Sequence, residues 1–245
     1  WTPNLETCEI IATPAGQMNM SLWRLDLSKL PTNLTYLRFP SVSRCLASSQ
    51  RWPPHLTTLH FNSSAETSLP SEEGDWLACL PPAVTKLHIP FHTQTLPSFN
   101  WSFLHLPHLQ HLHMPSMPTP EQLGQLPRTL QTLEGLRVMP VADPRLGEIS
   151  GHWAALPPTL TSLALQAGIH TPQIAQALPG SLTSLEVLGV ITPDAIQFLP
   201  SSLRSINRTI QHTSNVPLRN ISALKNLTYQ TTDVEGRVLE CTDVA

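Results

Sequence analysis

Apolar residues recur along the chain in a phrase that reads Leu-Pro-x-x-Leu-Thr-x-Leu-x-apolar. Its copies, four clear and four weaker, begin at Leu30, Trp52, Leu80, Leu106, Leu126, Leu156, Leu178 and Leu199. Around the third leucine of the phrase, which is Leu37 in the first copy, apolar and polar residues alternate, as they do in a strand with one buried face. The apolar side chains should therefore point into a core, and the two residues that flank this third leucine should point outward.

The predicted strands are spaced as in a repeat protein. Their first apolar residues lie 21 to 30 residues apart, at Leu34, Leu56, Val84, Leu109, Leu130, Leu160, Leu182, Leu203 and Leu224. A period in the twenties with an L-x-x-L-x-L core marks a leucine-rich repeat, in which each unit supplies one strand and one returning segment. Three return segments contain Thr-Pro, at Thr119, Thr171 and Thr192, which places a hydroxyl at a helix N-cap and proline at the first helical position. We therefore expect an α/β fold: a leucine-rich-repeat solenoid (horseshoe) of about nine repeats, with a parallel β-sheet on the concave face and short helices or turns on the convex face.

The phrase LP-x-x-L-T-x-L-x-F, found across residues 30–229, resembles the FNIP-type leucine-rich repeats abundant in social amoebae. It is more distantly similar to the LP-containing repeats of bacterial leucine-rich effectors. The chain lacks the Phe-Asn-x-Pro-Ile phrase, and it lacks the asparagine ladder that ordinary leucine-rich repeats place beyond the last strand leucine. The resemblance implies an interaction surface, with no catalytic residues to carry over. We expect residues 1–29 to cap the N-terminal end of repeats 30–229, and residues 230–245 to cap the other end.

Charge is sparse, and motifs that carry chemistry are missing. The 245 residues include 14 basic and 17 acidic ones, with a net charge of -3, so there is no basic field that would attract nucleic acid. The sequence has no G-x-S-x-G elbow, H-E-x-x-H pair, P-loop or dinucleotide-binding glycine motif, which argues against an enzyme and against a cofactor. It has no run of about 18 apolar residues, so we expect no direct membrane span.

Asparagine usage points to a secretory compartment. Seven of the nine asparagines begin an Asn-x-Ser/Thr triplet, whereas the serine and threonine content would give roughly two by chance. The seven candidate acceptors for N-linked glycans are Asn19, Asn33, Asn62, Asn100, Asn207, Asn220 and Asn226. Part of the excess has another source, because threonine is built into the repeat phrase at two of these triplets. Glycans would also hydrate the surface of so weakly charged a chain.

The four cysteines, Cys8, Cys45, Cys79 and Cys241, lack the close pair spacing of a zinc site. An even number in a secreted chain permits disulfides without assigning them. Cys8 falls in the predicted N-terminal cap and Cys45 in the first return segment, so Cys8 and Cys45 form the disulfide candidate.

The outward positions of the predicted strands form the candidate binding face. The side chains singled out there are Tyr36, Arg38, His60, Lys86, His88, His111, His113, Glu134 and Glu186. On the first four predicted strands the outward side chains are basic and imidazole-rich, and on the later strands they are small, neutral or acidic. The histidines His60, His88, His111 and His113 fall on three adjacent strands, where they could converge on a metal ion, form a pH-sensitive patch or remain an open row of exposed imidazoles. We expect no metal, because no carboxylate is in place to orient these rings.

These observations favour a non-enzymatic secreted or cell-surface leucine-rich-repeat glycoprotein. It would act by protein binding or self-assembly, as in an extracellular coat, filament or adhesive layer, with copies of itself or another extracellular protein as partner. The alternative is an intracellular leucine-rich-repeat scaffold or accessory subunit of a large complex, whose Asn-x-Ser/Thr triplets would be unused. A third hypothesis is a ligand-recognition ectodomain.

Overall fold

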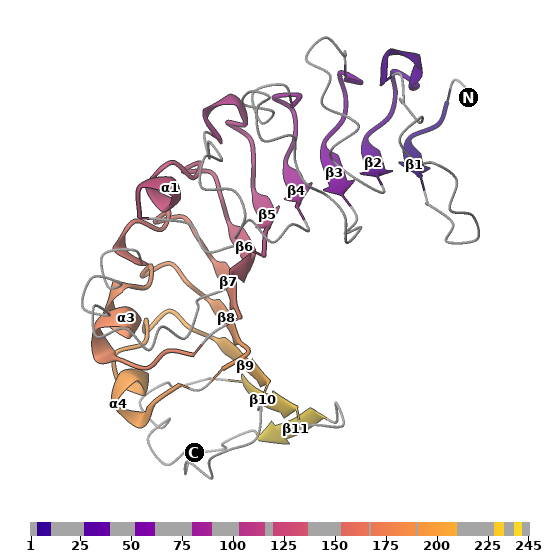
Figure 1. The fold of residues 1–245 in the computed structure, drawn as a ribbon. Helices are drawn as coiled ribbons and strands as arrows, with labels where there is room; N and C mark the ends of the chain where they lie inside the picture. The colour runs from indigo at the N-terminus through magenta and orange to yellow at the C-terminus, as the bar shows by residue number, and fades with distance from the viewer. Residues whose placement is uncertain are drawn as a thin grey trace, which may run out of the picture.

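The computed structural model describes residues 4–10, 27–39, 52–61, 80–89, 103–115, 120–136, 153–166, 168–189, 191–209, 228–232 and 238–241. These residues form a sheet of eleven strands that follow one another in chain order and curve into a horseshoe (Figure 1). The strands are β1 (Thr7–Glu9), β2 (Tyr36–Phe39), β3 (Thr58–Phe61), β4 (Lys86–His88), β5 (His111–His113), β6 (Thr132–Leu136), β7 (Ser162–Leu165), β8 (Ser184–Val187), β9 (Ser205–Thr209), β10 (Thr228–Thr232) and β11 (Val238–Cys241). The helical segments are the 3-10 helices η2 (Leu27–Lys29) and η5 (Phe103–His105) and the α-helices α1 (Pro120–Gly124), α3 (Pro172–Ala177) and α4 (Pro193–Ile196).

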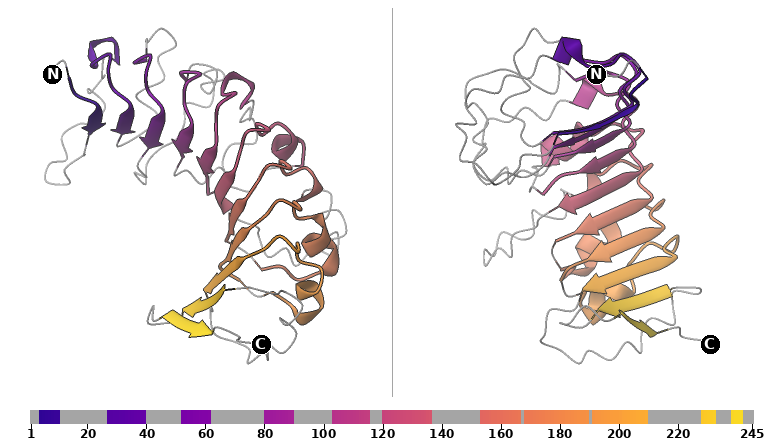
Figure 2. Two further views of the ribbon diagram at one scale, coloured as in Figure 1. Left: turned by 180° about the vertical axis from the view of Figure 1, so that it is seen from behind. Right: turned by 90° about the vertical axis from the view of Figure 1, so that its right-hand side faces the viewer.

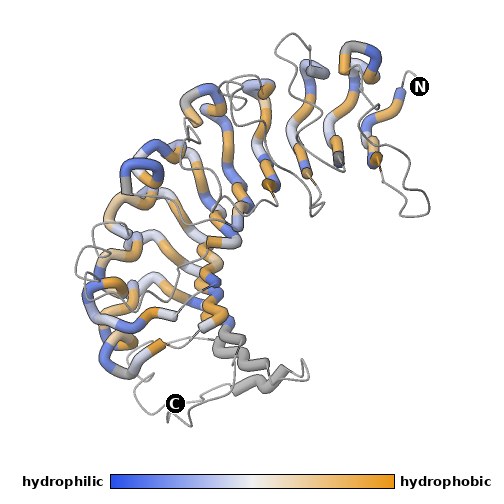
Figure 3. The backbone as a smooth tube through the Cα atoms, viewed as in Figure 1, coloured by the Kyte–Doolittle hydropathy of each residue, from blue (hydrophilic) through white to orange (hydrophobic). Residues whose placement is uncertain are grey.

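Strands β1 to β10 are parallel, so equivalent residues of successive repeats form rows across the sheet. The central inward row consists of Cys8, Leu37, Leu59, Leu87, Leu112, Leu133, Leu163, Leu185 and Ile206, and all of these side chains are buried. Figure 3 shows the apolar positions recurring between hydrophilic ones from turn to turn. The predicted architecture, an α/β solenoid of about nine repeats with a parallel sheet on its concave face, is confirmed.

The α-helices lie on the convex side of the sheet (Figure 2), and each begins at the proline of a Thr-Pro pair. At α3 the hydroxyl of Thr171 accepts a hydrogen bond from the backbone N–H of Ile174 at 3.3 Å, as the N-cap prediction requires. At α4 the prediction is wrong in this detail, because the Thr192 hydroxyl donates to the carbonyl of His170 instead. No helix in the described part of the chain is long and apolar enough to cross a bilayer.

The threonine of the repeat phrase has a structural role. In repeats that carry it, its hydroxyl donates to a backbone carbonyl of the preceding repeat, in the pairs Thr35 to Glu6, Thr57 to Thr35, Thr85 to Thr57, Thr161 to Gln131 and Thr183 to Thr161. A second hydroxyl ladder occupies the position before the first strand leucine, in the pairs Thr129 to Leu109, Thr159 to Leu130, Ser181 to Leu160 and Ser202 to Leu182. These contacts join neighbouring repeats where the sequence lacks the usual asparagine ladder.

Strand β6 contains a β-bulge. Leu133 pairs with Leu163 and Leu136 pairs with Leu165, so Glu134 and Gly135 together oppose the single residue Ala164. Gly135 has φ 84°, a left-handed conformation that glycine adopts without a steric penalty. The repeat pattern places Gly135 at the third inward position, but the extra residue brings Leu136 into the core there, where it is 2% exposed.

The two ends of the sheet add strands that the repeat phrase does not predict. Strand β1 lies in the predicted cap of residues 1–29 and pairs parallel with β2. Strand β11 pairs antiparallel with β10. The register of β10 also differs from the prediction, because Thr228 rather than Asn226 pairs with Ser205. The step from β9 to β10 is therefore two residues longer than the leucine pattern indicates.

Candidate binding site on the concave sheet

Two rows of side chains project from strands β1 to β6 on the concave face. One consists of Glu9, Arg38, His60, His88, His113 and Glu134, and is called the imidazole row below. The other consists of Thr7, Tyr36, Thr58, Lys86, His111 and Thr132. Each row alternates with the buried leucine row, because successive side chains of a strand point to opposite faces of the sheet. The predicted outward positions from Tyr36 to Glu134 therefore lie on the sheet surface.

The three histidines of the imidazole row are stacked face to face. The ring centroids of His60 and His88 are 3.9 Å apart with an interplanar angle of 7°. Those of His88 and His113 are 4.0 Å apart with an angle of 8°. Parallel strands impose this arrangement, since their spacing of about 4.8 Å brings equivalent side chains to stacking distance. His88 thus has both ring faces covered by its neighbours.

Charged groups close both ends of the stack. At one end Nη1 of Arg38 lies 3.9 Å from Oε2 of Glu9, and at the other Nδ1 of His113 lies 3.5 Å from Oε2 of Glu134. The hydrogen bond with His113 lowers the pKa of Glu134, and burial opposes this shift. The row therefore runs from a carboxylate through a guanidinium and three imidazoles to a second carboxylate.

Two of the stacked rings, His60 and His88, resist protonation. Burial, reinforced by the neighbouring His113 and His60, lowers the pKa of His88 from 6.5 to about 4. Burial and Arg38 lower the pKa of His60. In the second row, burial and Lys86 lower the pKa of His111. At neutral pH His60 and His88 are consequently uncharged, half-buried imidazoles.

The structure does not bring the four candidate metal ligands to one centre. His60, His88 and His113 turn flat ring faces toward each other, whereas a metal ion is bound in the ring plane through a nitrogen lone pair. His111 lies in the second row, between Lys86 and Thr132. In the part of the chain that the structure describes, no group of three or more histidine, cysteine or acidic side chains is placed to hold a metal ion.

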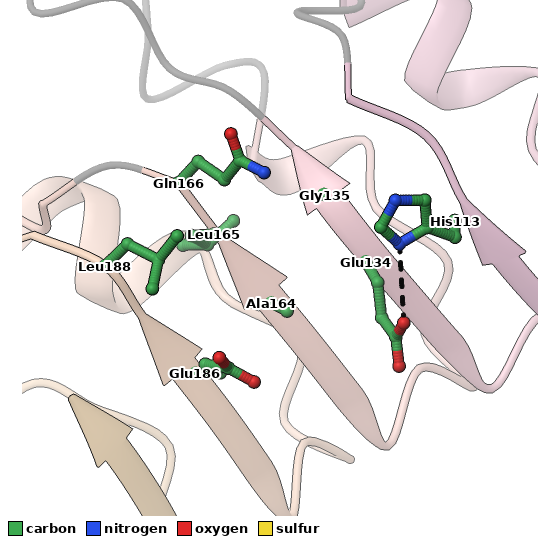
Figure 4. A pocket seen from close by; sticks show the side chains of 8 residues that line it. All are labelled: His113, Glu134, Gly135, Ala164, Leu165, Gln166, Glu186 and Leu188. Carbon is green, nitrogen blue, oxygen red and sulfur yellow. Dashed lines mark ion pairs between the residues drawn. The ribbon is translucent and has the colours of Figure 1, made fainter. Parts of the chain in front are cut away.

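A shallow hollow opens beside the C-terminal end of the imidazole row (Figure 4). Its volume is about 210 Å³, and its lining comprises His113, Glu134, Gly135, Ala164, Leu165, Gln166, Glu186 and Leu188. Ala164 separates Glu134 from Glu186, as the sequence predicts, and its short side chain leaves a gap between the two carboxylates. This end of the concave face is acidic, in contrast to the stretch from Arg38 to His113.

The structure places only some of the remaining predicted sites. Asn33 is exposed and Asn207 is half-buried in the outward row of β9, next to Glu186, while Asn19, Asn62, Asn100, Asn220 and Asn226 lie outside the described residues. The Cys8 side chain is buried, and burial raises the pKa of its thiol. Cys45 lies outside the described residues, so the proposed disulfide stays a prediction.

The sequence predicts five of the six members of the imidazole row as outward residues but does not predict how they are arranged. The prediction groups His111 with the other histidines and leaves out Glu9, because β1 does not carry the repeat phrase. The missing information is the register between strands. A strict alignment of the L-x-L cores would have separated His111 from His113 into different rows, although it would not have located β1.

Comparison with known proteins supports the fold. No protein-family model and no characterised protein sequence matches the chain. Among solved structures, the leucine-rich-repeat-containing protein LegL7 from Legionella pneumophila is similar over 87% of this chain and 78% of its own, with 17% identity and a TM-score of 0.54. The circular leucine-rich-repeat protein CroV588 matches 84% of this chain and 36% of its own, with 19% identity and a TM-score of 0.40. The similarity to LegL7 identifies the fold as a leucine-rich-repeat solenoid.

Proposed function

We propose that this leucine-rich-repeat solenoid is a non-enzymatic binding protein that receives a protein partner on its concave sheet. The observation that carries the proposal is the imidazole row, where six outward side chains on adjacent strands form one ordered strip. The leucine row beneath is almost fully buried, so the strip stands on a rigid base. Binding faces gain affinity when their side chains are held in place before the partner arrives.

The composition of the strip suits protein recognition. Arginine and aromatic side chains are enriched at protein interfaces because they bury large areas and also offer hydrogen bonds. Such groups are provided by Arg38, Tyr36 and the stacked histidines on the four adjacent strands β2 to β5. In the part of the chain that the structure describes, they lie on the open surface of the sheet, whereas small-molecule sites are usually concave cavities that bury most of their ligand.

We further propose that the protein is a secreted or cell-surface glycoprotein, as the sequence predicts. Support comes from the seven Asn-x-Ser/Thr triplets and from the exposure of Asn33. The partner would be an extracellular protein or another copy of the chain, in a coat, filament or adhesive layer. A glycan on Asn207 would stand on the concave face beside the acidic end, and would direct a large partner toward the imidazole row.

Two measurements test these proposals separately. Treatment of protein from its native source with peptide N-glycosidase should lower its mass by the mass of at least three glycans. An unchanged mass would contradict secretion and favour the intracellular scaffold. For binding, the protein should capture a partner from native material, and Arg38→Ser should weaken capture. The control Gln197→Ser, at an exposed position of the convex side, should have no effect; equal capture by both variants would contradict the concave site.

A further inference from the structure

The imidazole row has a charge pattern that restricts what it can bind. Its centre offers one permanent cation, Arg38, and three imidazoles that become cations when protonated. In the neighbouring row the exposed Lys86 lies on the same strand as His88, and His111 lies on the same strand as His113. The acidic groups near the histidines are Glu9 on β1 and Glu134 on β6.

We propose that the imidazole row is the docking site for a short acidic segment of a partner protein, and that docking is accompanied by proton uptake on the stacked histidines. The inference rests on the proposed function, because it specifies the chemistry of the partner that the concave face receives. It assigns recognition to the edges of the rings. The faces of His88 are covered by His60 and His113, so its ring nitrogens meet a partner only at the edge.

Carboxylates fit this strip better than neutral or basic groups. An acidic side chain above the row accepts hydrogen bonds from imidazole N–H groups and lies near Arg38 and Lys86. Charge-assisted hydrogen bonds of this kind are about twice as strong as neutral ones. A basic segment would instead face Arg38, Lys86 and any protonated ring.

The segment should be short because carboxylates bound the strip. Glu9 and Glu134 lie at its two ends, and Glu186 lines the hollow next to Glu134. The four strands from β2 to β5 span only about 14 Å at the usual strand spacing. A long polyanion such as a sulfated polysaccharide would extend past both ends and meet these carboxylates. An acidic stretch of about four extended residues would fit between these carboxylates.

Proton uptake follows from the stacking. Adjacent imidazolium rings at about 4 Å repel each other, and burial adds to the cost at His60 and His88, so charging all the stacked rings together is unfavourable in the free protein. A bound carboxylate offsets that repulsion and favours the charged form. By thermodynamic linkage, a complex that holds more protons than its free components becomes tighter as pH falls, by up to about tenfold per pH unit for each proton taken up.

A labelled hexapeptide of alternating Glu and Gly tests the proposal, with the matching Gln and Gly hexapeptide as control. Fluorescence anisotropy should show the acidic peptide binding at least tenfold tighter at pH 5.5 than at pH 7.5, and calorimetry in buffers of different ionisation enthalpy should show proton uptake. The variant His88→Gln should lose most of the pH dependence. Absence of binding at both pH values, or unchanged pH dependence in His88→Gln, would overturn the proposal.

A second pair of variants protects the test against a folding defect in His88→Gln. Glu134→Gln removes the carboxylate that competes for His113 and should tighten peptide binding, whereas Glu186→Gln removes the same charge beyond Ala164 and should change it less. Equal effects of the two substitutions on peptide affinity would contradict the assignment of binding to the imidazole row. If heparin fragments of equal charge bound more tightly than the peptide, the ligand of the row would be a polysaccharide, and the proposal of an acidic protein segment would be wrong. If a native partner were captured equally at both pH values and equally by the His88→Gln variant, the proposed function would hold and only this inference would be overturned.

Discussion

Gly135 provides the sharpest test of the structure, because the bulge in β6 depends on its backbone conformation. Its φ of 84° lies in the left-handed region. A Cβ added there would lie 3.1 Å from the carbonyl carbon of Met114, 3.2 Å from its oxygen and 3.3 Å from Cε1 of His113. Two of these three contacts are with the backbone of the adjacent strand, which cannot rotate away. Gly135→Ala should therefore strain both β6 and the end of the imidazole row.

The expected loss of stability follows from these two effects. Placing a non-glycine residue in the left-handed region costs about 1–2 kcal/mol, and inserting a methyl group into a packed site costs about 1–3 kcal/mol. Alanine also restricts the unfolded chain, which returns about 0.4–1 kcal/mol. The free energy of unfolding should thus fall by about 2–4 kcal/mol.

Urea unfolding followed by circular dichroism measures this change, and Gly180→Ala is the matched control. An added Cβ at Gly180 meets nothing within 4 Å, so this substitution should be neutral or stabilise the protein by up to about 1 kcal/mol. If Gly135→Ala proved as stable as Gly180→Ala, the bulge would be misplaced, and with it the account of how Leu136 reaches the core.

Three further predictions concern the rows of the sheet. Leu163→Ala removes a fully buried side chain and should lower the free energy of unfolding in urea by about 2–5 kcal/mol, whereas the outward Ser162→Ala should change it by less than about 0.5 kcal/mol; similar values would reverse the inward and outward assignment. Thr183→Val removes the 3.1 Å hydrogen bond to the Thr161 carbonyl and should cost about 1 kcal/mol, so an unchanged midpoint would deny the hydroxyl ladder a stabilising role. Because the pKa of His88 is about 4 in the folded protein and 6.5 as a free side chain, the unfolded chain binds more protons between those values and stability falls as pH drops through that window. The His88→Gln variant should recover about 1–2 kcal/mol of this loss in the free energy of unfolding, after allowance for solvent screening. If the free energy of unfolding depended on pH in the same way in the wild type and in this variant, the lowered pKa would not belong to His88.

The fold could be predicted because the same strand-forming phrase recurs many times along the chain. Each Leu-x-x-Leu-x-Leu core specifies a short strand with one buried face, and the regular spacing specifies that the strands stack. Deviations from the phrase were harder to predict. Strand β1 is built around Cys8 rather than leucine, and the step to β10 is two residues longer than the distance from Leu203 to Leu224 indicates.

The candidate site was predictable in its residues more than in its geometry. Outward positions follow from alternation alone, so Arg38, His88 and Glu134 were correctly placed on the concave face. Stacking depends on which residues share a row, and that requires the register between strands. The bulge at Gly135 was not predicted either, because a glycine at an inward position reads equally well as a small core residue.

The reversed direction of β11 bears on how such an array can change length. A new repeat joins the series by laying its strand parallel to the last one, and β11 already occupies that edge of β10. Duplication of a unit therefore succeeds most easily in the interior, where a copied repeat that carries the phrase threonine finds a backbone carbonyl acceptor on its neighbour. The interior step from β7 to β8, which keeps both ladders, is the natural point of insertion. A gain there would lengthen the acidic and neutral part of the concave face while leaving the imidazole row intact.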